Sequence, residues 1–155
     1  LFTEATWGDL DFMIIDLPPG TGDIHLSLVQ TVQLSGAVVV STPQDVALAD
    51  ARKGVGMFRL EAVNVPVLGM IENMAYFRPE DAPDKKYHIF GRDGVKRLAE
   101  TLETTFLGEL PLLQTVREAG DAGRPAVMQT DSNASAAFKV VVSNLLGVLG
   151  KNVDE

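Results

Sequence analysis

The sequence predicts an α/β protein in which a parallel β-sheet is covered by helices on both faces. Apolar runs of strand length alternate along the chain with longer segments that have helical periodicity. The apolar runs are continuous rather than alternating, which is typical of strands buried on both faces. Alternation of such strands with helices favours a parallel sheet, because each helix returns the chain to the start of the next strand.

The first half of the chain contains two predicted strands and two predicted helices. Residues 11–16 (DFMIID) are expected to form a buried strand, because the middle of this run is continuously apolar. The next segment, 17–22 (LPPGTG), holds two prolines and two glycines, so it cannot continue as strand or helix. Asp23 is the expected N-cap of a helix that ends near residue 33. A second buried strand is predicted at 36–42 (GAVVVST), and a helix over 45–60 follows it.

The second half continues the same alternation within what we expect to be part of a single domain spanning residues 1–155. A third strand is predicted at 66–72 (PVLGMIE). Residues 75–90 are polar and contain proline, so they are expected to form an irregular excursion. The remaining predicted elements are a helix at 93–102, a strand at 105–110, and helices at about 113–119 and 132–149.

Composition narrows the classes of function. The 155 residues are 46% apolar and 22% charged, which suits a globular chain with a real core. The net charge is −8 and no basic stripe offsets it, so nucleic acid is not an expected partner. No apolar run is long enough to predict a membrane span. The cysteine count is zero, so neither a disulfide nor a thiolate metal site is expected within the chain, and the cytoplasm is the default compartment.

Polar or backbone-shaping residues follow each predicted strand. They are Asp16 after the first strand, Ser41 and Thr42 after the second, Glu72 and Asn73 after the third, and Pro111 after the fourth. Because ligands of parallel α/β sheets bind at the carboxyl ends of the strands, we expect a binding site at this edge.

The strongest local signal is DLPPGTGD at 16–23, directly after an apolar run. An aspartate at a strand end can hold Mg²⁺ against nucleotide phosphates. The glycines that follow let backbone N–H groups approach a phosphate oxygen. Ordinary Gly/Pro turns share this composition, so the spacing alone leaves both interpretations open.

Two related phosphate-binding motifs are missing. A dinucleotide fingerprint would require glycine at position 25, which is His25, so an NAD site is not expected. The chain contains no G-x-x-x-x-G-K-[ST] loop, although such a loop supplies most of the phosphate binding in nucleotidases. Because the chain begins with Leu1 rather than Met, we expect a fragment whose phosphate-binding loop precedes it.

Five blocks of the sequence together form a recognisable pattern: 11–23 (DFMIIDLPPGTGD), 36–54 (GAVVVSTPQDVALADARKG), 65–74 (VPVLGMIENM), 89–91 (IFG) and 107–125 (LGELPLLQTVREAGDAGRP). This pattern resembles the Mrp/ApbC-type ATPases, which are iron–sulfur cluster carriers in the MinD/ParA-like branch of P-loop proteins. The resemblance covers nearly the whole chain. It implies a P-loop NTPase fold truncated at the N-terminus, with ATP and Mg²⁺ as cofactors and a homodimer as the assembly.

The resemblance also implies roles on the phosphate side of the site. Asp16 would be the Walker B aspartate and the Mg²⁺ ligand. Gly20 would lie in the switch II loop facing the γ-phosphate, and Asp23 would belong to the same switch. Asp50 would lie near the signature lysine of this branch, either within one subunit or across the dimer interface. A solvated helix face is at least as good an interpretation of Asp50.

On the base side, the resemblance implies that Asn73 hydrogen-bonds the adenine edge, since its amide supplies both a donor and an acceptor. Pro111 and Leu112 would line the base pocket. The chain departs from the family pattern in one respect. Many members carry a Cys-x-x-Cys pair between the ENM and IFG blocks, whereas the corresponding stretch 75–89 has no cysteine. An iron–sulfur cluster, which needs thiolate ligands, would therefore be held elsewhere in the intact protein, held only with a partner, or not held at all.

Three functions remain open at this stage. The first is an ATP hydrolase that carries iron–sulfur clusters to recipient or scaffold proteins, with this chain alone inactive. The second is a partitioning or positioning ATPase of the MinD/ParA kind, which needs a membrane-binding helix or a basic surface. The C-terminal residues 145–155 offer no basic face. The third is a nucleotide-binding module without turnover.

Overall fold

A three-stranded parallel sheet with the order β1-β2-β3 lies at the centre of the computed structural model. The model describes residues 4–18, 22–79, 81–82, 84–128 and 133–150. The strands are β1 (Ala37–Ser41), β2 (Val67–Glu72) and β3 (Phe106–Glu109). They lie within the predicted runs 36–42, 66–72 and 105–110, so these three strands are confirmed, as is their parallel pairing.

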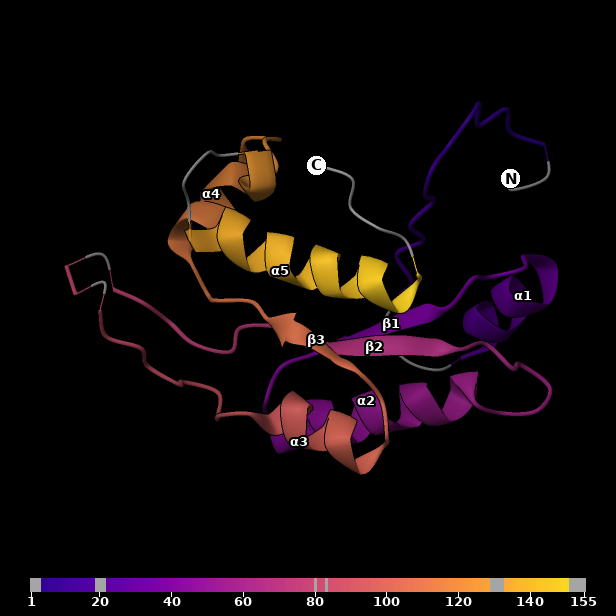
Figure 1. Cartoon of the computed structure of the whole chain (residues 1–155), viewed down its shortest axis with the longest axis horizontal. Coiled ribbons are helices and arrows are strands. Elements are labelled where there is room, and N and C mark those ends of the chain that lie inside the picture. The colour runs from indigo at the N-terminus through magenta and orange to yellow at the C-terminus, as the bar shows by residue number, and fades with distance from the viewer. Residues whose placement is uncertain (1–3, 19–21, 80, 83, 129–132, 151–155) are drawn as a thin grey trace.

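Helices cover both faces of this sheet (Figure 1). They are α1 (Asp23–Thr31), α2 (Asp45–Phe58), α3 (Gly94–Thr101), α4 (Gln114–Asp121) and α5 (Asn133–Val148), with a 3₁₀ turn, η1 (Ala126–Met128). The helix α5 lies on one face, and α2 and α3 lie on the other (Figure 1). The predicted α/β architecture is therefore confirmed.

The side chains of β2 point alternately to the two faces of the sheet, so this one strand contributes to a hydrophobic cluster on each face. Neighbouring side chains on a strand point to opposite faces. Met70 packs with residues of α2 and α3, whereas Ile71 packs with Leu107 and with Val141 of α5. All four of these side chains are buried. A run that is apolar at every position is thus required here, as the sequence pattern indicated.

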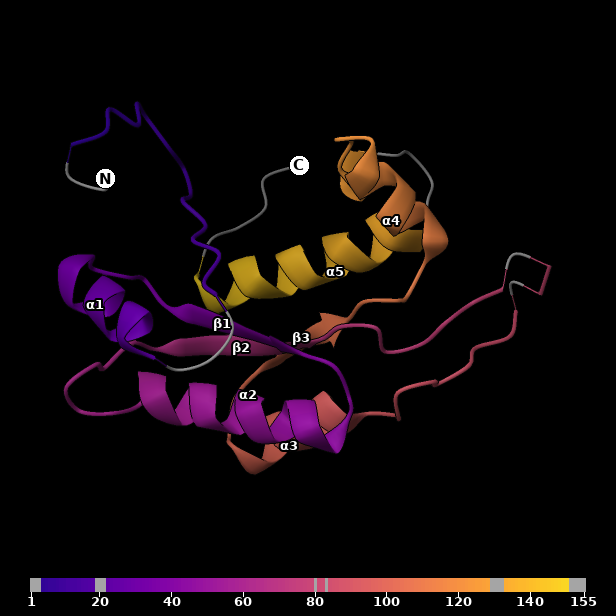
Figure 2. The ribbon, with the colours of Figure 1, turned by 180° about the vertical axis from the view of Figure 1, so that it is seen from behind.

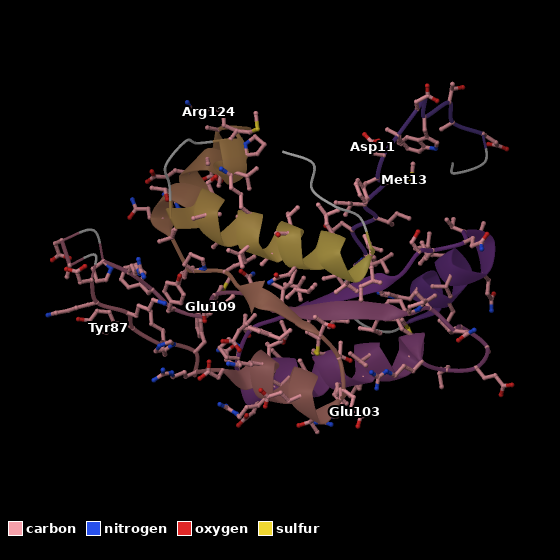
Figure 3. The ribbon with its side chains drawn as sticks, in the orientation of Figure 1. Asp11, Met13, Tyr87, Glu103, Glu109 and Arg124 are labelled. Carbon is pink, nitrogen blue, oxygen red and sulfur yellow. The ribbon has the colours of Figure 1, made fainter. Side chains whose placement is uncertain are left out.

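The prediction of a strand at 11–16 is wrong for this structure. Residues 4–18 form an extended arm without regular secondary structure, and Ile14 is 91% exposed. Figures 2 and 3 show this arm running away from the sheet, with Asp11 and Met13 on it. The physical reason is that a parallel strand needs a hydrogen-bonding neighbour, and the arm pairs with neither edge of the sheet. Apolar character alone does not make a strand.

The start of α1 differs from the prediction by one residue. The N-cap is Gly22 rather than Asp23, and no side chain caps this end. Gly22 has extended backbone angles, with φ −79° and ψ −173°, so helical geometry begins at Asp23 itself.

We expect Leu107→Ala to lower the free energy of unfolding of this chain by about 2–5 kcal/mol, because Leu107 is fully buried and the change leaves a cavity. Ile14→Ala, a similar truncation on the exposed arm, should change it by less than about 0.5 kcal/mol. Urea unfolding of both variants checks this. A comparable loss in both would show that residues 11–16 belong to the core after all.

Candidate functional site

The carboxyl ends of the three strands meet at one edge, as the sequence predicted. Backbone hydrogen bonds connect the segments that leave the strands there. Asn73 donates its N–H to the carbonyl of Ser41 at 2.8 Å, which joins the ends of β2 and β1. Leu110 donates to the carbonyl of Glu72 at 2.8 Å, and Ala75 donates to that of Leu110 at 3.0 Å, which joins the ends of β2 and β3.

This edge brings together the three residues predicted for base recognition. Asn73 is half-buried, and its Oδ1 accepts a hydrogen bond from the N–H of Met74 at 3.0 Å. Met74 has a positive φ of 54°, so a tight turn follows Asn73 directly. On the neighbouring segment Pro111 is buried and Leu112 is half-buried. Leu112 donates its N–H to Tyr76 at 2.8 Å. A carbonyl-type oxygen has two lone pairs, so Asn73 keeps acceptor capacity for a ligand.

Asp16 is exposed and lies apart from this edge. Its neighbour Leu17 packs against the buried cluster of Met57, Phe58 and Val65, and the first residues of β1 and β2, Ala37 and Val67, pack against the same cluster. Figures 1 and 2 show the N-terminal arm meeting the sheet on the same side as α1, at the amino-terminal ends of the strands. The expectation that Asp16 shares an edge with Asn73 is therefore not met in this structure, because residues 11–16 are not in the sheet.

Of the other residues predicted for the phosphate side, only Asp50 has a side chain that the structure describes. Asp50 lies on α2 and forms a salt bridge with Lys53 at 3.1 Å, and the two side chains are 72% and 70% exposed. The high exposure of both side chains is typical of a solvated helix face. Asp23 begins α1, but its side chain is outside the described part of the structure. Gly20 lies wholly outside the described residues.

Glu72 is a further residue of this edge, and no specific role was predicted for it. It ends β2, and its side chain is only 2% exposed. Its Oε2 accepts a hydrogen bond from the N–H of Val95 at 2.7 Å, in the first turn of α3. Burial raises the pKa of Glu72 above its ordinary value of 4.5, and the nearby carboxylates of Asp93 and Glu109 add to the rise. The sequence signal that could have pointed to Glu72 is an acidic residue at the end of an otherwise apolar strand.

The excursion between β2 and α3 packs around one aromatic ring. Tyr76 is buried, and the Nζ of Lys86 lies 4.0 Å from the centre of its ring, with the guanidinium carbon of Arg78 at 5.4 Å. His88 meets the same ring edge-on and places Nδ1 3.0 Å from the carbonyl oxygen of Ala75. Tyr87, which Figure 3 labels on the same excursion, is instead 48% exposed.

The chemistry of the donors decides which metals fit. Across the residues that the structure describes, no three His, Asp or Glu side chains lie close enough together to hold a metal ion. Mg²⁺ in nucleotide sites is usually held by one or two carboxylates with the phosphates, so a single aspartate such as Asp16 fits that chemistry. An iron–sulfur cluster does not fit, because the chain has no cysteine. In the described part of the chain, no helix has the length and apolar character that crossing a bilayer requires.

The sheet and its covering helices match part of a MinD/ParA-like P-loop NTPase fold in solved structures. A nucleotide-binding protein from Archaeoglobus fulgidus in complex with ADP superposes with a TM-score of 0.67 at 39% identity, over 76% of this chain and 47% of that one. The cell division ATPase MinD from Pyrococcus furiosus gives 0.53 at 22% identity, over 74% and 43%. At that identity the likeness to MinD shows the fold alone.

Sequence comparison defines the family. The model of the ParA family of NUBPL iron-transfer P-loop NTPases matches residues 1–146, and the chain belongs to this family. The iron–sulfur cluster transfer protein NUBPL of Mus musculus is 48% identical over 147 residues, which are 94% of this chain and 45% of that protein. The iron–sulfur cluster carrier protein of Escherichia coli is 43% identical over 150 residues, 96% of this chain and 40% of that protein. The chain thus spans less than half the length of these relatives.

Replacing Glu72 by glutamine should remove a pH dependence of stability. The pKa of Glu72 is higher in the folded than in the unfolded chain, so the folded state binds this proton more tightly. The stabilisation is complete below the ordinary value of 4.5 and is lost as the pH rises through the raised pKa. The free energy of unfolding of E72Q should therefore rise relative to wild type across that interval.

Urea unfolding at a series of pH values between 4.5 and neutrality measures this difference. Glu100→Gln, which changes an exposed glutamate on α3, is the matched control. Parallel pH profiles for wild type and E72Q would contradict the prediction.

Proposed function

We propose that the intact protein binds and hydrolyses ATP and uses this cycle to carry iron–sulfur clusters to recipient proteins. The observation that carries the proposal is the identity of 43–51% to iron–sulfur cluster carrier and transfer proteins such as those of Escherichia coli, Mus musculus and Deinococcus radiodurans. The matches extend over more than nine-tenths of this chain. The chain covers less than half of each relative, so the proposal concerns the intact protein.

The base side of the nucleotide site would be formed by this chain's own residues. Asn73, Pro111 and Leu112 already share the carboxyl edge, held by the hydrogen bonds between the ends of β2 and β3. The Asn73 amide would meet the polar edge of adenine, while Pro111 and Leu112 would pack on its face. The fixed turn at Met74 would hold the amide in place before the nucleotide arrives, which lowers the entropic cost of binding.

The phosphate side would need residues from outside this chain as well. Asp16 would hold Mg²⁺, which when bound supplies positive charge against the phosphates. Gly20 and Asp23 would form the loop that meets the γ-phosphate. For this role Asp16 must reach the carboxyl edge, which requires 11–16 to pair with a strand that this chain does not contain. Asp50 is proposed to approach a signature lysine across a homodimer interface.

The iron–sulfur cluster is cargo in this proposal, and its ligands are not in this chain. Thiolates would have to come from the rest of the intact protein or from a scaffold or recipient partner. The absence of cysteine here confines this chain to the nucleotide-dependent part of the work. The proposed compartment is the cytoplasm, although one relative from Arabidopsis thaliana is named mitochondrial.

In the intact protein, Asp16→Ala should lower the Mg²⁺-dependent rate of ATP hydrolysis by a factor on the order of 100 or more, because a bound metal ion contributes several kcal/mol to stabilising the transition state. Asp11→Ala, on the same arm, is the control and should leave the rate unchanged. Phosphate release at saturating ATP measures both. Normal turnover in the Asp16 variant would remove this residue from the mechanism.

Asn73→Ala should reduce the preference for ATP over GTP by roughly tenfold, which corresponds to about 1.4 kcal/mol, the value of one hydrogen bond to the base. Dissociation constants of the two nucleotides in the intact protein measure the preference. Asn144→Ala removes an asparagine of α5 that donates to Leu107 at 2.8 Å, and it should not alter the preference. An unchanged preference in the Asn73 variant would refute its base-reading role.

A further inference from the structure

The N-terminus of α3 lacks a cap from its own segment. The N-cap residue, Asp93, has a left-handed backbone with φ of 55°, and its side chain makes no capping hydrogen bond. The first N–H groups of a helix must find acceptors, because no residue lies one turn earlier to supply them. Here the acceptor comes from another element. The Glu72 carboxylate accepts a hydrogen bond from the N–H of Val95 at 2.7 Å.

This cap is buried, which makes its geometry strict. A buried carboxylate is costly unless its oxygens are hydrogen-bonded, so Glu72 must stay where the N–H groups of α3 meet it. The N-terminus of α3 is also packed closely against the turn after β1. A Cβ on Gly94 would lie 2.6 Å from the carbonyl oxygen of Pro43, which leaves room only for glycine. A shift of the first turn of α3 would therefore disturb both its hydrogen bond with Glu72 and its close contact with Pro43.

The main chain of Glu72 is continuous with the proposed base-reading residue. Its carbonyl accepts from Leu110 at 2.8 Å, and the next residue, Asn73, donates to Ser41 at 2.8 Å. The side chain of Glu72 therefore fixes α3, while its backbone fixes the start of the Asn73–Met74 turn. The segment that leaves β2 after Asn73 returns to the sheet at Gly94, so both of its ends meet at Glu72.

We infer that Glu72 is a positioning residue for base recognition: its link between the end of β2 and the first turn of α3 sets where the Asn73 amide lies. The inference rests on the proposed function, since it assumes that Asn73 reads the base. Loss of the link would leave the sheet intact, because the strands keep their own hydrogen bonds. It would release the turn at Asn73 from the fixed end of α3.

The test measures dissociation constants for ATP and GTP in the intact protein with wild type, Glu72→Gln, Asn73→Ala and the double variant. The glutamine keeps the size of the side chain but loses the charge that strengthens the bonds to α3. We expect Glu72→Gln to reduce the ATP-over-GTP preference by about threefold to tenfold. The double variant should lose no more preference than Asn73→Ala alone, because the two residues act through one contact.

A second variant keeps the test informative if Glu72→Gln does not fold. Gly94→Ala disturbs the same junction from the side of Pro43, and it should shift the preference in the same direction. Glu100→Gln on the exposed face of α3 is the control and should change nothing. Thermal unfolding of each variant separates lower stability from altered recognition, since a purely structural role would lower the melting temperature without changing the preference of the folded protein.

The outcomes separate this inference from the proposed function. If wild type binds no ATP, the proposed function fails. If wild type prefers ATP and Asn73→Ala loses the preference, but Glu72→Gln and Gly94→Ala keep it, the function stands and the positioning role is overturned. Additive losses in the double variant would also overturn it, because they would show that Glu72 acts independently of Asn73.

Discussion

A parallel strand is stable only when its backbone N–H and C=O groups meet a neighbouring strand, and this constraint governs the structure. The three strands β1, β2 and β3 satisfy it for one another, and their common direction places all their carboxyl ends at one edge. Asn73, Pro111, Leu112 and Glu72 all lie at that edge. The apolar run at 11–16 pairs with neither edge strand of this sheet, and it lies in an exposed arm.

At the edge, one buried carboxylate connects elements that are distant in sequence. Glu72 would be costly to bury alone, and the N–H groups at the start of α3 would be costly to leave without acceptors. The 2.7 Å hydrogen bond from the N–H of Val95 offsets both costs, because it gives the buried carboxylate a donor and the N–H an acceptor. Polar residues in a core are kept in place more strictly than apolar ones, because their hydrogen bonds have direction. That strictness suits a residue next to Asn73, the proposed base-reading residue.

The two sides of the proposed nucleotide site differ in how complete they are. Asn73, Pro111 and Leu112 are assembled by bonds within this chain. Asp16 is separated from them, and the chain contains neither a phosphate-binding loop nor cysteine. The chain spans 40–45% of the length of these relatives, and in the proposed function the phosphate side also needs residues from the rest of the intact protein. Recognition of the base and chemistry at the phosphates would then depend on how this chain meets the rest of the protein.

The sequence by itself determined the helices, three of the strands and the parallel direction of those strands. It also determined the family. These depend on local periodicity and on motifs such as DLPPGTGD and STPQD, which need no knowledge of distant contacts. Only the tertiary structure decided that 11–16 is unpaired and that Glu72 caps α3 while Asp93 does not. It also showed that Asp50 pairs with Lys53 in solvent. Each of these outcomes depends on which segments become neighbours in space, and a hydrogen-bond partner from another element leaves no signature in local sequence.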